Sequence, residues 1–380
     1  MKKKLLALVL SVMCVASLVA CGGGAASSAA EAPAESKEET APAESKEEAA
    51  PAESQEEAPA EEAAAEPAGD VITIQVGYEN NPGEPLDIGC NAWKEKLDEI
   101  SDGSIKIELF PSSQLGGKVD AMDMMQMGEP VAYITDGSFL GDYGAPELSI
   151  FGAPYLFTSY DDLHKIPQTE WWQEQMDLLA QNGLHVITTN WEYGVRNLMT
   201  VKPVRKFDDL SGMIIRTPQN VVQVKTFEYM GAAPTGMALG DVYTATQQGT
   251  IEGMENPIAT LYGQTYYEVA KYLTMTEHLF VLTQFVMSND VWNSLTEQQQ
   301  QWLTEAGDFG GEANNKAQVE LTEKFIQEMK DQGVEVIELD DAEKQKFIDS
   351  VDGLYSDPEV TAKWRENLRD VIKEQVAAVG

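Results

Sequence analysis

The chain is poor in the residue types on which most catalytic and metal sites depend. Its 380 residues include three cysteines and three histidines, and no histidine stands at metal-ligand spacing from a cysteine or carboxylate. It has no G-x-x-x-x-G-K-[ST] phosphate loop, no G-x-G-x-x-G, no G-x-S-x-G elbow and no H-E-x-x-H. These motifs mark nucleotide, serine-nucleophile and zinc sites. We therefore expect no catalytic residue, no metal and no cofactor.

Positive charge is scarce as well. The chain has 26 Lys and Arg residues against 63 Asp and Glu residues, a formal net charge of −37. Nucleic acids and anionic membrane surfaces need an extended basic footprint, so both are excluded as direct partners. The composition, 43% hydrophobic and 23% charged, is that of a globular protein. About 310 residues follow the first seventy, a length that favours two lobes over one.

The first twenty residues have the pattern of a signal peptide. Lys2 to Lys4 precede an apolar stretch from Leu5 to Ala20, which is too short for a comfortable membrane span. The segment Leu18-Val19-Ala20-Cys21 resembles the bacterial lipoprotein lipobox. That resemblance implies cleavage before Cys21 and lipidation of its thiol, and the alternative is a plain secretory signal with an incidental cysteine.

The sequence of residues 21–69 indicates a tether that begins with the lipidated cysteine. The nonamer at 32–40 recurs at 41–49 and, with a Gln in place of Lys, at 50–58. The repeat contains no large apolar side chain, so it has nothing with which to form a core and we expect it to stay disordered. Like charges and prolines should keep this tether extended.

The rest of the chain predicts an α/β fold. β-rich runs alternate with amphipathic helical segments, which favours parallel strand pairing. In such sheets, ligands bind where the carboxyl ends of strands meet. Glu79, Asn80 and Asp136 fall at predicted strand ends, where capping of loops is the alternative role. The apolar run from Leu279 to Met287 predicts a strand buried on both faces that crosses between the lobes.

The strongest clue to function is a local reversal of charge. Between Tyr193 and Lys225 there are six cations and two anions, a net charge of +4 in an acidic chain. Arg216 lies in this window at the end of an apolar strand that Pro218 stops. A guanidinium in that position is suited to gripping an anion, and an interlobe salt bridge is the alternative. Asn256 likewise stands at a strand end, before Pro257.

Several motifs resemble those of a known family. They are Phe110-Pro111-Ser112-Ser113-Gln114-Leu115-Gly116, Gly194-Val195-Arg196, Leu210-Ser211-Gly212-Met213-Ile214-Ile215-Arg216-Thr217-Pro218, Gly231-Ala232-Ala233-Pro234-Thr235-Gly236-Met237 and Glu255-Asn256-Pro257. In this order they look like the hallmarks of the TRAP-transporter solute receptors of the DctP type. The resemblance implies a periplasmic-binding-protein-like α/β fold whose two lobes, joined by crossing strands and a long hinge-spanning helix, close on an organic acid. The lobes would be residues 70–193 with about 281–321, and 194–280 with about 322–380.

The resemblance also implies roles for individual residues. Arg216 would bind the ligand carboxylate, Arg196 would support it, and Asn256 would contact the ligand. Asp136 would face ligand hydroxyls, as would Glu79 or Asn80, and we include Asn220 among the candidates. Lys118, after Gly117, and Leu239 depart from the pattern of sialic-acid receptors. We therefore expect a smaller sugar acid such as a uronate, with a C4-dicarboxylate or a keto acid as the alternative.

The expected partners follow from the same resemblance. The receptor would deliver its ligand to the membrane subunits of a TRAP permease, as an extracytoplasmic monomer anchored to the membrane by lipid on Cys21. Two other classes remain open. A lyase or hydrolase would need a base near Arg216, for which Glu192, Asp241 and Glu255 are the candidates. A structural or adhesive surface lipoprotein would not need the positive window.

Overall fold

The computed structural model describes residues 71–379. The predicted signal peptide, Cys21 and the repeat tether lie outside the described residues. The described part is built on one mixed sheet of nine strands. The strands are β1 Ile72–Gly77, β2 Ile105–Phe110, β3 Val131–Asp136, β4 Leu184–Thr200, β5 Ile214–Thr217, β6 Ala233–Gly236, β7 Gly253–Pro257, β8 Tyr272–Ser288 and β9 Glu335–Glu338.

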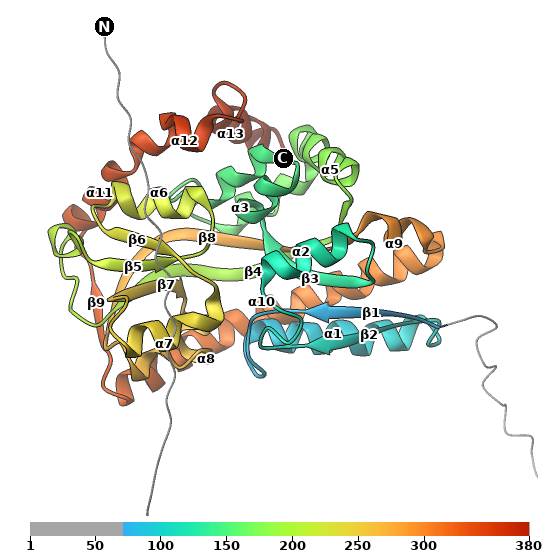
Figure 1. Cartoon of the computed structure of the whole chain (residues 1–380), viewed down its shortest axis with the longest axis horizontal. Helices are drawn as coiled ribbons and strands as arrows, with labels where there is room; N and C mark the ends of the chain where they lie inside the picture. The colour runs from blue at the N-terminus through green and yellow to red at the C-terminus, as the bar shows by residue number, and fades with distance from the viewer. Residues whose placement is uncertain (1–70, 380) are drawn as a thin grey trace, which may run out of the picture. The chain divides into compact units, whose positions relative to one another are not determined.

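Helices cover both faces of this sheet (Figure 1). Helices α1 and α10 lie on one side of it, and α5, α6, α12 and α13 lie on the other (Figure 1). The α-helices are α1 Pro85–Ile100, α2 Lys118–Gln126, α3 Gly137–Leu140, α4 Tyr160–Leu163, α5 Glu170–Gln181, α6 Val221–Tyr229, α7 Val242–Gln247, α8 Ile258–Gly263, α9 Asn289–Ser294, α10 Glu297–Asp331, α11 Asp341–Ser350, α12 Pro358–Thr361 and α13 Leu368–Ala378.

The sheet changes character along its width. Its strand order is β2-β1-β3-β8-β4-β7-β5-β6, with β9 on β8. Pairing is parallel at both ends, as the alternation of strands and helices predicted. The prediction was wrong for the middle, where β3–β8, β8–β4 and β4–β7 pair antiparallel. The reason is that β4 and β8 run in opposite directions through the sheet and connect its two parallel ends.

These two connecting strands have 17 residues each. The apolar run predicted a crossing strand at β8, and Phe285 to Met287 are indeed fully buried. Strand β4 is irregular. It continues through four register irregularities between Val186 and Leu198, and Gly194 takes a φ of 115° within them, a conformation open mainly to glycine.

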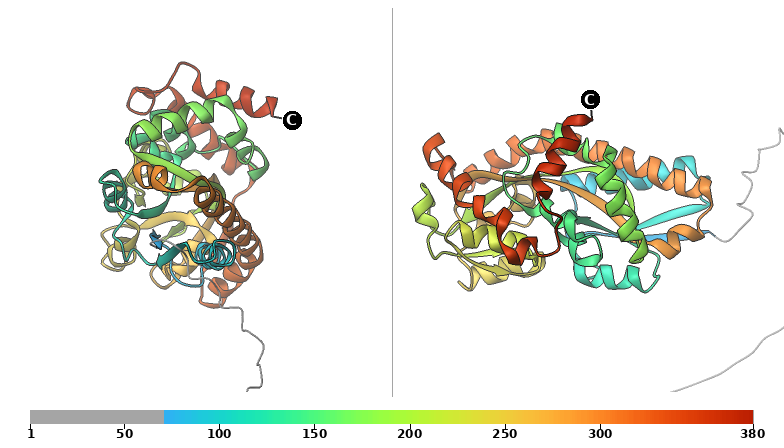
Figure 2. Two further views of the ribbon diagram at one scale, coloured as in Figure 1. Left: turned by 90° about the vertical axis from the view of Figure 1, so that its right-hand side faces the viewer. Right: turned by 90° about the horizontal axis from the view of Figure 1, so that it is seen from above.

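The long helix α10 runs beside strands of both halves of the sheet (Figures 1 and 2). It begins with a capping box, in which Thr296 and Gln299 each bond the other's backbone N–H. It packs closely on α1 because glycines replace larger side chains at the contact. A Cβ on Gly310 would lie 2.7 Å from the carbonyl oxygen of Gly89.

Two main apolar cores lie on the described part of the chain. The larger contains Trp93, Trp191 and Phe285, and the C-terminal helices α12 and α13 add Val360 and Ile372 to it. The other includes residues of α7, α8 and the second half of α10 together with residues of β4, β7 and β8. The residue boundaries of the two lobes stay a prediction. Among residues 71–379, no helix has the length and hydropathy needed to cross a membrane.

Candidate functional site

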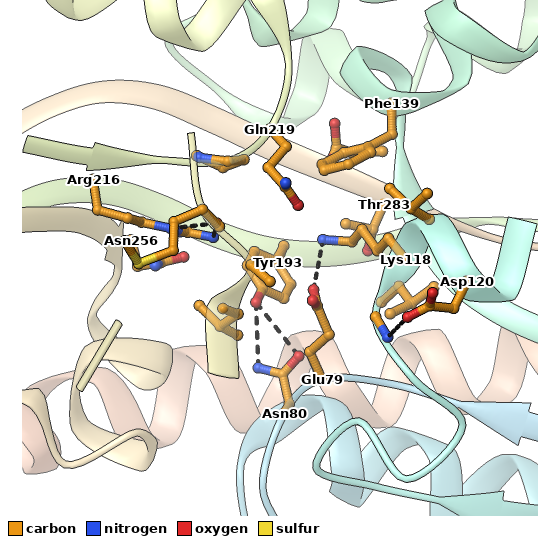
Figure 3. Close-up of a pocket in the computed structure, with 18 of the residues that line it drawn as sticks. Glu79, Asn80, Lys118, Asp120, Phe139, Tyr193, Arg216, Gln219, Asn256 and Thr283 are labelled. Carbon is orange, nitrogen blue, oxygen red and sulfur yellow. Dashed lines mark hydrogen bonds and ion pairs between the residues drawn. The ribbon is translucent and has the colours of Figure 1, made fainter. Parts of the chain in front are cut away.

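A cavity of about 320 Å³ opens at the ends of the strands, near the middle of the sheet. Its lining comes from segments far apart in sequence, including the loop after β1, the start of α2, the ends of β3, β5 and β7, and the middle of β4 and β8. Six of the seven predicted ligand-binding residues line it: Glu79, Asn80, Asp136, Arg196, Arg216 and Asn256. Figure 3 shows Arg216 and Asn256 at one end, and Lys118 and Asp120 at the other.

Arg216 is a buried cation without an acidic partner. It is 4% exposed, at the end of β5. Its Nε and Nη2 both donate to the carbonyl oxygen of Met237, at 2.9 and 2.6 Å, and no described carboxylate forms an ion pair with it. Burial lowers the pKa of this guanidinium because the charged form is poorly solvated. Its remaining donors can be satisfied by an anion in the cavity.

Arg196 is held differently. Its Nε and Nη2 donate to the two carboxylate oxygens of Glu255, at 2.5 and 2.7 Å, and Glu255 also hydrogen-bonds Nε2 of His278 at 3.1 Å. Burial raises the pKa of Glu255, but the charge and hydrogen bonds of Arg196 outweigh that effect and hold it at about 2. The charge of Arg196 is therefore balanced by the protein itself, as the supporting role predicted for it requires.

Asn256 presents a free donor beside Arg216 (Figure 3). Its side chain is 2% exposed, and its amide nitrogen has no hydrogen-bond partner among the described residues. An unsatisfied buried donor costs roughly 1–3 kcal/mol. A ligand oxygen in the cavity would meet this donor, so the position of Asn256 fits the predicted contact.

The opposite end of the cavity carries an ion pair. The ammonium of Lys118 lies 3.0 Å from a carboxylate oxygen of Glu79 and 5.0 Å from the ring centre of Phe139. Burial lowers the pKa of Lys118, but the nearby carboxylates of Glu79 and Asp136 outweigh it and raise the pKa overall. Lys118 therefore stays protonated. In the sequence analysis, Lys118 appears only as a departure from the sialic-acid receptors. Its position at the start of α2, after two glycines, could have marked it as a lining residue.

Two other predicted polar residues, Asp136 and Asn80, make hydrogen bonds within the fold and also line the cavity. Asp136 accepts hydrogen bonds on Oδ1 from the backbone and hydroxyl of Ser138, as the N-cap of α3. Asn80 donates to Glu84 at 2.6 Å and lies 3.4 Å from the hydroxyl of Tyr193. Both side chains still line the cavity.

Asn220 is the one predicted residue that the structure does not bring to this cavity. Its side chain is the N-cap of α6, accepting from the backbone of Gln223 at 2.9 Å. The four-residue pattern Asn-Val-Val-Gln is that of a capping box, which explains its position better than a ligand contact does. The cavity is also lined by residues that the sequence did not single out, among them Asp120, Phe139, Tyr193, Gln219 and Thr283.

Comparison with known proteins identifies the family. The model of the DctP family, described as bacterial extracellular solute-binding protein, family 7, matches residues 76–375. The chain belongs to the DctP family. The predicted family, and with it the predicted class of extracytoplasmic solute receptor, are confirmed.

Solved DctP-type structures confirm the two-lobed α/β fold. A TRAP periplasmic solute-binding protein from Ochrobacterium anthropi, with bound L-fuconate, is 38% identical, with a TM-score of 0.77 over 81% of this chain and 100% of that one. Another from Actinobacillus succinogenes 130Z, with bound L-galactonate, is 33% identical, with a TM-score of 0.77 over 80% and 99%. The C4-dicarboxylate-binding DctP of Rhodobacter capsulatus is 27% identical over 71% of this chain and 80% of its own length.

Proposed function

We propose that this DctP-type receptor binds a sugar acid between its two lobes and delivers it to a TRAP permease. The observation that carries the proposal is Arg216, a buried guanidinium whose only hydrogen bonds in the described part go to one backbone carbonyl. A ligand carboxylate would complete it with charge-assisted hydrogen bonds, typically worth about 1.5–3 kcal/mol each. Arg196 would support this contact while its own charge stays balanced by Glu255.

The polar lining supports a hydroxylated acid. Beyond the carboxylate end, the cavity offers the amide of Asn256 and the side chains of Asn80, Asp136 and Thr283, groups that exchange hydrogen bonds with hydroxyls. Relatives with bound L-fuconate and L-galactonate point to the same class of ligand. A C4-dicarboxylate is the alternative, and the Rhodobacter relative favours it.

The role is binding without turnover. Of the three candidate bases, Glu255 is engaged by Arg196, and neither Glu192 nor Asp241 lines the cavity. In this proposal the receptor acts outside the cytoplasm as a monomer. Lipid on Cys21 would anchor it, and residues 21–69 would serve as the tether. A structural or adhesive lipoprotein would not require an unpaired arginine in a cavity.

The test is a ligand screen with a matched pair of arginine variants. The purified protein is heated with L-galactonate, L-fuconate, D-erythronate, D-glucuronate, succinate and pyruvate, and hits are quantified by calorimetry. Binding to the folded state raises stability by RT ln(1 + [L]/Kd), so a ligand in large excess over Kd is detectable. A sugar acid should bind, and Arg216→Met should weaken it at least tenfold. Arg205→Met, which removes an exposed arginine paired with Glu335, should stay within twofold of the native protein.

Two results would overturn the proposal. One is the lack of any stabilising carboxylate in the panel. The other is a bound acid whose affinity in Arg216→Met remains within twofold of the native value.

A further inference from the structure

The two ends of the cavity differ in their charge balance. At one end, Arg216 has no acidic partner within residues 71–379, and Arg196 is neutralised by Glu255. This end therefore has one positive charge to offer a ligand. A single carboxylate balances it.

The other end is already occupied by charges of the protein. Lys118 is paired with Glu79 at 3.0 Å, and the two side chains are only 17% and 10% exposed. Asp136 lies on the same side of the cavity, because it pairs in register with Thr283, which Figure 3 places beside Lys118. Asp120, which accepts a hydrogen bond from the backbone of Gly117, also lines this end. Three carboxylates against one ammonium leave this end with a surplus of negative charge.

A hydroxyl fits such a place better than a second carboxylate. A hydroxyl can donate to a carboxylate and accept from an ammonium in the same position. Only Oδ1 of Asp136 is engaged by Ser138, and no described residue bonds its Oδ2. A second carboxylate would have to leave water and face Glu79 and Asp136, and like charges at short range are strongly unfavourable in a poorly solvated cavity.

We propose that Glu79, Lys118 and Asp136 form a hydroxyl-reading subsite that makes the receptor select acids with one carboxylate and a polyhydroxyl tail, and reject acids with a carboxylate at both ends. This proposal rests on the proposed function, since it assumes that Arg216 holds the first carboxylate. The subsite would separate aldonate-like ligands from dicarboxylates. Lys118 is the specificity-determining residue, because it fixes Glu79 and is the one cation that a second carboxylate could use.

The size of the cavity is consistent with this arrangement. At about 320 Å³ it lies at the small end of the range for ligand pockets. Phe139, under the ammonium of Lys118, adds an apolar face at the same end. An extended acid of four to six carbons can therefore reach from Arg216 toward Lys118.

The experiment compares acids that differ only in their last carbon. Three pairs are used: L-galactonate with galactarate, D-gluconate with D-glucarate, and D-erythronate with meso-tartrate. In each pair the terminal hydroxymethyl group of the first acid is a carboxylate in the second. For the pair whose first acid binds most tightly, the native protein should bind the monoanion at least tenfold more tightly than the dianion, by calorimetry at pH 7.5.

Variants of the ion pair should shift this ratio in opposite directions. Glu79→Gln removes one negative charge and releases Lys118, so the ratio should fall at least fivefold through a gain in dianion affinity. Lys118→Met removes the cation and leaves the carboxylates, so the dianion should lose more affinity than the monoanion and the ratio should rise. Glu108→Gln, on the exposed face of β2, is the matched control and should leave the ratio unchanged. A purely structural role would weaken both ligands of a pair equally.

Thermal unfolding of each variant shows whether it folds. If Glu79→Gln does not, Asp136→Asn provides the same loss of one negative charge. The inference is overturned if a native pair binds within twofold, if the dianion is preferred, or if neither charge-removing variant lowers the ratio. In each of those cases, the proposed function still stands if Arg216→Met weakens the binding of the acid. If no carboxylate binds at all, the proposed function fails first, and the inference fails with it.

Discussion

Arg196 and Glu255 form a bidentate ion pair in the interior, with Nε and Nη2 at 2.5 and 2.7 Å from the two carboxylate oxygens. Arg216, on the other side of β7, has no such partner. The two arginines of the cavity are therefore different in kind. One is balanced within the fold, and the other has no acidic partner among the described residues. Breaking the Arg196–Glu255 pair and removing Arg216 should therefore have opposite effects on stability.

Glu255→Gln should destabilise the ligand-free protein by about 3–5 kcal/mol, because it strands a buried guanidinium. The carboxyl has a pKa of about 2 in the folded protein, below its ordinary value of 4.5. Its contribution to stability is therefore present above about pH 4.5 and is lost as the pH falls toward 2. Urea unfolding at pH 7 and at pH 3 checks both points, and the variant should lose less stability between them than the native protein does. Equal losses would contradict the role given to Glu255.

Arg216→Met should stabilise the ligand-free protein by about 1 kcal/mol or more. The substitution replaces an uncompensated buried charge with an apolar side chain of similar length, a change that is often stabilising. Urea unfolding without ligand measures it. A loss of stability as large as that of Glu255→Gln would mean that Arg216 is a structural residue.

Glu84→Gln should reduce the loss of stability that the native protein shows as the pH rises from about 4.5 to 8. Glu84 is 3% exposed and accepts hydrogen bonds from Asn80 and from the backbone of Asn81. Burial raises its pKa to about 8, against the lowering effect of these bonds. The folded state thus keeps a proton that the unfolded chain releases near pH 4.5, so native stability should fall as the pH rises from about 4.5 to 8.

The Glu84 measurement is urea unfolding at pH 6 and pH 9. The amide variant should gain stability relative to the native protein at pH 9, and Glu108→Gln should not. Identical slopes for native protein and Glu84→Gln would contradict the assignment.

Gly310→Ala should destabilise the protein by about 2 kcal/mol or more. Alanine is the better helix former, but here its methyl group would lie 2.7 Å from the carbonyl oxygen of Gly89 and 2.8 Å from Cβ of Trp93, so α10 would have to move off α1. Gly240→Ala is the control, since its methyl group would meet nothing within 4 Å. Thermal unfolding compares the two, and a stable Gly310→Ala variant would mean that the helices can separate without loss.

Much of the fold followed from local pattern. The apolar run from Leu279 to Met287 predicted the crossing strand, which lies in β8, and the long helix that the resemblance implied is α10. The course of β4 was not predicted beyond Thr189, because its register irregularities break the alternation that marks a strand. Strand β6 could not be predicted either, since Gly231 to Pro234 is rich in turn residues and pairing with β5 overrides that preference.

Some residues that line the cavity could likewise be predicted from the sequence, and others could not. Arg216 and Asn256 could be predicted because each ends a strand before a proline. Thr283 could have been found as a polar residue inside an otherwise apolar run. Lys118 could not be paired with Glu79 from sequence, since 39 positions separate them and only the packing of α2 beside β1 and β3 brings them together. Gln219 lies on the connection between β5 and α6, and Phe139 lies in the four-residue helix α3. Both segments are too short to show periodicity, and nothing local marks these residues as lining residues.

The irregular stretch of β4 places a residue that lines the cavity within a strand that connects the two parallel ends of the sheet. Arg196 lies at the last of the four register irregularities, two residues after the glycine with a φ of 115°. If the lobes close by bending the sheet there, part of the binding free energy is spent as elastic work on the strand. The stiffness of β4 then sets affinity and release rate alongside the side chains. Receptors with identical cavities could hold the same acid for different times, through backbone changes that never touch it.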